Sequence, residues 1–69
     1  MKKYTYIIET KSLKANDNST EEFCVNADTE AEAWNKADDY FNAADFKITS
    51  IWKSGNNDGY HNDDNIWVR

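Results

Sequence analysis

The 69-residue chain has few of the residues that cross-link very small domains or fold them around a metal: one cysteine, one histidine, two glycines and no proline. A single cysteine cannot form an intramolecular disulfide, which excludes a disulfide-stabilised secreted scaffold. One cysteine and one histidine are too few ligands for a four-ligand zinc site, which excludes a zinc finger. The length allows one small domain. We therefore expect a single domain over residues 1–69, with no metal and no cofactor.

Basic residues are also scarce, because 8 Lys and Arg stand against 13 Asp and Glu, for a net charge of −5. A protein that binds nucleic acid directly needs positive charge to displace the counterions of the phosphates, so the charge disfavours this class. No apolar run approaches the roughly 20 residues that cross a bilayer. Met1–Lys3 leads through a short apolar stretch to Glu9, which is not the pattern of a secretory signal. We expect a cytoplasmic protein without membrane contact.

The chain does contain ten aromatic residues, and these fall in periodic segments. Four segments have the alternation of β-strands: Lys3–Lys11, Glu21–Asn26, Phe46–Lys53 and Asn65–Arg69. The first two are joined by a short polar stretch, which predicts an antiparallel hairpin. The turn-rich residues 54–59 predict that the last strand pairs back on the third.

One helix is expected between the second and third strands. Thr29 followed by Glu32 matches a capping box, and the predicted helix runs from Glu30 to Asn42. Its apolar stripe comprises Ala33, Trp34, Ala37, Tyr40, Phe41 and Ala44. The order β-β-α-β-β predicts an α+β fold, with one antiparallel-rich four-stranded sheet and a single helix on one face.

Groups for catalysis are few. Cys24 and His61 are the only ordinary nucleophile and base, and a cysteine within a strand usually behaves as a small buried apolar residue. Residues 54–65 place Ser54, Asn56 and Asp58 at calcium-loop positions, but position twelve is Asn65 where a bidentate Glu is needed. The sequence therefore predicts that the protein is not an enzyme and has no metal site.

Acidic residues and aromatics are the features with a bearing on function. Residues 15–45 contain nine Asp and Glu against Lys36 alone. These acids either form a solvated face or mimic phosphates that bind a Lys/Arg-lined groove of another protein. One helix covers one face of a sheet, so some large apolar side chains should lie on the other. If Tyr4, Tyr6 and Ile8 face the helix, Ile7 lies on the open face, and Ile51 is expected beside it. The opposite assignment exposes the tyrosines instead.

An open aromatic face suggests a protein contact or self-association, and stacking of single-stranded RNA is a further alternative that the negative charge opposes. Trp52 and Trp67 are expected either as neighbours across the last hairpin or on opposite faces of it.

In its layout the chain resembles the anti-CRISPR proteins, which are very small phage-encoded inhibitors. The residues that carry the likeness are the opening strand Met1–Ile8, the strand-to-helix junction Val25–Trp34 and the strand Ile48–Ile51. The resemblance implies binding to a CRISPR effector and a block of DNA binding or cleavage without catalysis. It supplies no functional residues to carry over.

The sequence thus predicts a non-enzymatic phage or mobile-element protein that inhibits a host nucleic-acid-processing complex in the host cytoplasm, with anti-CRISPR activity as the specific hypothesis. The alternative is a homodimeric structural or regulatory module. The residues expected to contact the partner are Glu30, Glu32, Asp38, Asp39, Asp45, Tyr60 and Trp67.

Overall fold

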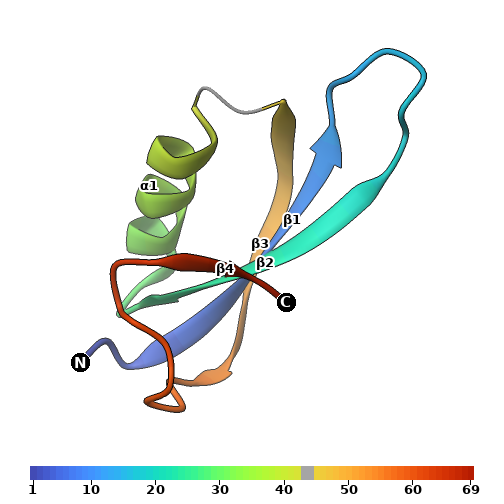
Figure 1. Ribbon diagram of the computed structural model, residues 1–69. Coiled ribbons are helices and arrows are strands. Elements are labelled where there is room, and N and C mark those ends of the chain that lie inside the picture. The colour runs from blue at the N-terminus through green and yellow to red at the C-terminus, as the bar shows by residue number, and fades with distance from the viewer. Residues whose placement is uncertain (43–44) are drawn as a thin grey trace.

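The computed structural model describes residues 1–42 and 45–69 (Figure 1). Its elements are β1 (Tyr4–Ser12), β2 (Thr20–Ala27), α1 (Glu30–Phe41), β3 (Phe46–Asn56) and β4 (Ile66–Val68). The four strands form one antiparallel sheet and α1 lies along one side of it, which confirms the predicted α+β fold. Ala44, expected on the helix stripe, lies outside the described residues.

The sheet order is β3-β1-β2-β4, so the prediction that the last strand pairs with the third is wrong. β1 takes the position beside β3, and β4 pairs with β2 at the opposite edge. The segment 57–65 crosses the end of the sheet to reach that edge. Three strand spacings of about 4.8 Å separate the edges, a distance that a nine-residue segment spans with ease.

Helix α1 begins as predicted. The Thr29 hydroxyl oxygen accepts a hydrogen bond from the Glu32 backbone N–H at 3.1 Å, and Thr29 itself is extended. Small residues at Ala33 and Ala37 are fully buried, so the helix lies close to the sheet. Trp34 and Tyr40 were expected within the apolar stripe and are exposed, because a helix packed on a sheet buries only a narrow stripe.

The core lies between α1 and the sheet. From β1 and β2 it takes Tyr6, Ile8, Phe23, Val25 and Ala27; from the helix it takes Ala33, Ala37 and Phe41. The rings of Phe23 and Phe41 meet edge to face with centroids 5.0 Å apart. Tyr6 and Ile8 therefore share one face of the first strand, as predicted, and this face lies toward the helix, which decides between the two assignments that the sequence left open.

A bulge in β3 changes which residues of that strand face the helix. Ser50 lies opposite Glu9 and Ile48 opposite Thr10, which leaves Thr49 without a partner position. The extra residue reverses which face of the sheet the following residues of β3 point to. Ile51 consequently joins the core, and its expected place on the open face is wrong.

The crossing segment 57–65 is fixed by the Asp63 carboxylate. This group accepts hydrogen bonds from the Lys2 backbone N–H at 3.1 Å and from the Asn57 side-chain amide at 2.9 Å. The Lys36 ammonium donates to the Asp63 carbonyl at 2.6 Å. Asp63 therefore ties the N-terminus, the end of β3 and the helix together, and it holds this segment against the end of the sheet.

Candidate functional site

The sheet face opposite α1 carries a row of four residues in register. Trp52 lies opposite Ile7, Ile7 opposite Cys24, and Cys24 opposite Trp67. Directly paired residues share a face, so both tryptophans lie on this face, at opposite edges of the sheet. This differs from both expected arrangements, because β3 and β4 form no hairpin.

The middle of this row is buried between the two outer tryptophans. Ile7 is 4% exposed and Cys24 is 6% exposed, although α1 lies on the other face of the sheet, whereas Trp52 is 37% exposed. Trp67 is half-buried and stacks on His61, with ring centroids 3.8 Å apart and nearly parallel planes. The open face is therefore partly closed by its own aromatic side chains, and Trp52 is the large apolar group that it presents.

The surroundings of Cys24 and His61 indicate structural roles for both residues. Burial raises the pKa of the Cys24 thiol, which leaves less of the nucleophilic thiolate at neutral pH. The His61 ring packs on Trp67, and its backbone carbonyl accepts a hydrogen bond from the Asn26 side-chain amide. Cys24 thus lies in the covered middle of the row, and His61 helps to close the open face.

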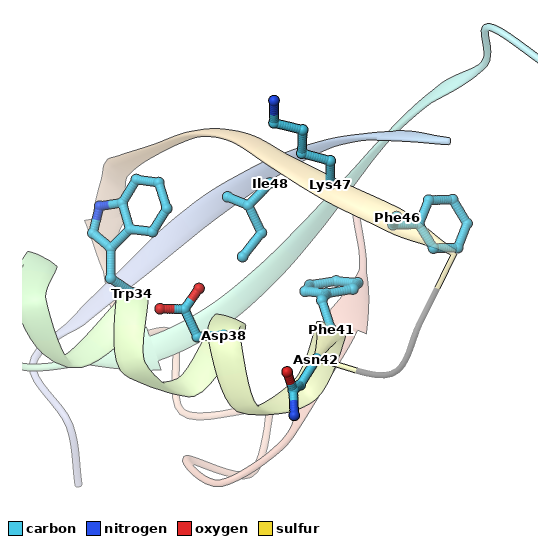
Figure 2. Close-up of a pocket in the computed structure, with 7 residues that line it drawn as sticks. All are labelled: Trp34, Asp38, Phe41, Asn42, Phe46, Lys47 and Ile48. Carbon is cyan, nitrogen blue, oxygen red and sulfur yellow. The ribbon is translucent and has the colours of Figure 1, made fainter. Parts of the chain in front are cut away.

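A groove of about 340 Å³ runs between α1 and β3 on the other side of the molecule (Figure 2). It is lined by Trp34, Asp38, Phe41, Asn42, Phe46, Lys47 and Ile48. Phe41 is buried and Ile48 is half-buried, so they form an apolar floor. Trp34 is 36% exposed and stands at one end, while Asn42 lies beside Phe41 toward the helix C-terminus.

The groove is electrostatically negative on its helix side. The Asp38 carboxylate points into the space between Trp34 and Ile48, and Asp38 is exposed (Figure 2). The C-terminal end of a helix carries about half a negative charge, and the last turn of α1 contains no basic residue. Lys47 extends from β3 away from the helix, so its ammonium does not occupy the space beside Asp38 (Figure 2).

The acids predicted to contact a partner differ in whether they form ion pairs within the molecule. Glu32 is bound at 2.7 Å by Lys2 and at 3.5 Å by Lys36, and the hydrogen bond from Lys2 lowers the pKa of Glu32. Glu32 is therefore engaged within the molecule. The other four predicted acids, Glu30, Asp38, Asp39 and Asp45, are exposed and have no ion pair among the described residues.

These residues do not form one patch. Asp38 lines the groove on the β3 side of α1, whereas Asp39 lies in a hollow on the β4 side, with Lys36 and Tyr40. Tyr60 is 88% exposed in the crossing segment, and Trp67 is half-buried beside His61.

Sequence reasoning missed the groove itself, although the position of Trp34 at the border of the stripe was a signal that its ring could be exposed.

Comparison with known proteins found no matching family model, no matching curated protein and no matching solved structure. Within residues 1–42 and 45–69, no helix has the length and hydropathy to cross a membrane, and no cluster of three or more His, Cys, Asp or Glu side chains is arranged to hold a metal ion. The site is therefore interpreted from its own geometry.

Proposed function

We propose that the protein is a non-enzymatic, cytoplasmic inhibitor from a phage or mobile element, which binds a host complex that handles nucleic acid. Its exposed carboxylates take the place of phosphates in a basic groove of the partner. Anti-CRISPR activity, in which a CRISPR effector is kept from binding or cutting DNA, is the specific form of this proposal. It rests on the layout resemblance and on the surface described above.

The observation that carries the proposal is the placement of Asp38 and Asp39. Both are exposed in the last turn of α1, where the helix dipole disfavours negative charge, and that turn itself contains no basic residue. Each such acid costs the fold about 0.3–1 kcal/mol. A solubilising charge would serve equally well elsewhere on the helix. Local rules are most often broken at functional sites, so the placement favours a role in binding.

The proposal is tested by interference in cells. The chain is expressed together with each of a panel of CRISPR types that cleave a target plasmid, and transformation by that plasmid is counted. We expect transformation to be restored for at least one type, and less so for the Asp38→Asn, Asp39→Asn double variant. Glu22→Gln is the control, because Glu22 lies away from α1 and pairs with Arg69. No rescue with any type would refute anti-CRISPR activity.

Direct competition tests the mechanism. An effector that is inhibited in cells is purified and mixed with the protein before labelled target DNA is added. If the acids replace phosphates, DNA binding falls as the protein is added, and higher salt weakens the inhibition. Inhibition of cleavage with DNA binding unchanged would contradict the phosphate-mimic form of the proposal.

A second candidate function is self-association, and one observation favours it. In the part of the chain that the structure describes, the 11-residue strand β3 pairs with β1 alone, so its outer edge is open beside the exposed Trp52. Open edges can pair with a second copy. Light scattering over a concentration series decides the matter: a mass that stays at the monomer value excludes this candidate, and one that rises to twice that value with concentration supports it.

A further inference from the structure

The groove between α1 and β3 combines an aromatic face, an apolar floor and negative charge at one end of a helix. We propose that it is a receptor for one arginine side chain of a partner protein. The identity of that partner rests on the proposed function, while the recognition of arginine rests on the groove alone.

The floor suits the aliphatic part of a long side chain. Phe41, Phe46 and Ile48 line the groove without any polar side-chain atom. The rings of Phe41 and Phe46 have centroids 6.4 Å apart and meet edge to face, which holds the floor in shape. An arginine can bury its three methylene groups on such a surface while its charged head stays near water.

Acceptor groups at both ends of the groove favour a cation. The Asp38 carboxylate lies beside the Trp34 ring (Figure 2). A guanidinium can therefore stack on the ring and donate hydrogen bonds from its edge to the carboxylate. Asn42 lines the other end of the groove, where its side-chain carbonyl is a further acceptor. Among the described residues that line the groove, Lys47 is the one basic residue, and its side chain points away from the groove.

Arginine fits this arrangement better than lysine does. Its planar head presents donors at its edge and a flat face for stacking, and it gives up water more readily than an ammonium. Phosphate and carboxylate ligands are repelled by Asp38 and by the helix terminus. Arginine is also a residue that lines phosphate-binding grooves, so one such side chain held here would be withdrawn from its nucleic acid.

Nuclear magnetic resonance with short peptides tests the receptor without the partner. The probe is acetyl-Gly-Arg-Gly-amide, and the controls carry citrulline, its neutral isostere, or lysine in place of arginine. Three tryptophans give three indole N–H signals. We expect the arginine peptide to shift the Trp34 signal saturably, with the Trp52 and Trp67 signals unchanged, and the citrulline peptide to bind more weakly.

Two variants with the same charge change locate the contact. Asp38→Asn removes the carboxylate in the groove, and we expect it to weaken binding of the arginine peptide about two- to fivefold, as for an exposed ion pair. Asp39→Asn is the matched control, because Asp39 does not line the groove. Trp34→Leu should abolish the stacking contribution, and its folding is checked from the dispersion of the backbone signals.

The outcomes separate this inference from the proposed function. A Trp34 signal that does not move, equal binding of citrulline, or equal losses in Asp38→Asn and Asp39→Asn would each overturn the arginine receptor, whether or not an effector is inhibited. A saturable, charge-dependent shift that only Asp38→Asn weakens would establish it. The plasmid assay then decides independently whether the receptor serves inhibition of a CRISPR effector.

Discussion

Removal of one negative charge from α1 should change stability with opposite signs at the two ends of the helix. Asp38 lies in the last turn and Glu30 in the first, and both are exposed. At an exposed site the helix dipole contributes about 0.3–1 kcal/mol per charge. Asp38→Asn should therefore raise the free energy of unfolding by that amount, and Glu30→Gln should lower it by a similar amount.

The pair is well matched. Each substitution removes one charge from a chain of net charge −5, so any relief of general repulsion has the same sign in both variants. Asp and Asn differ little in helix propensity, and so do Glu and Gln. Neither residue has a charged neighbour three or four positions away on the helix, since Glu30 faces Ala33 and Trp34 while Asp38 faces Trp34 and Asn42.

The assay is urea unfolding at pH 7, supported by thermal melts. For a domain of this size each kcal/mol corresponds to about 4–8 °C, so Asp38→Asn should raise the melting temperature by roughly 1–8 °C. The difference between the variants should shrink in 1 M salt, where screening is strong. If both variants change stability in the same direction by similar amounts, the helix terminus does not penalise Asp38 and the argument for a functional placement fails.

Three further predictions concern the fold and its polar contacts. Ile8→Ala, which empties a fully buried core position, should cost about 2–5 kcal/mol in urea unfolding, and a loss under 1 kcal/mol would mean that the core repacks around the cavity. Asp63→Ala leaves the Lys2 N–H and the Asn57 amide without their acceptor and should cost about 1–3 kcal/mol, with faster hydrogen exchange confined to the crossing segment. Because the hydrogen bond from Lys2 lowers the pKa of Glu32, the stability that Glu32 contributes is present at neutral pH and lost as pH falls through its folded-state pKa. The natural chain should therefore lose more stability between pH 7 and pH 3 than Glu32→Gln does, and equal losses would contradict this.

The predicted site residues illustrate what a sequence can reveal about a surface. The excess of acids over residues 15–45 was visible from composition, and Asp38 and Asp39 were correctly expected on the helix. Sequence alone did not show that Glu32 is bound by Lys2, thirty positions earlier, because such a pair depends on the fold bringing the N-terminus close to the first turn of α1. The groove was hidden for the same reason, since Ile48 and Trp34 meet only when β3 packs beside α1.

The sequence by itself determined the features that depend on neighbouring residues: the helix start at Thr29, the two faces of β1, and the hairpin of β1 and β2. The tertiary structure decided the partner of β4, the bulge at Thr49 that turns Ile51 into the core, and which carboxylates stay free. Periodicity specifies which side of a strand is apolar, but it leaves open which edge that strand joins. Only the competition of all segments for the same sheet edges and the same buried space selects one arrangement.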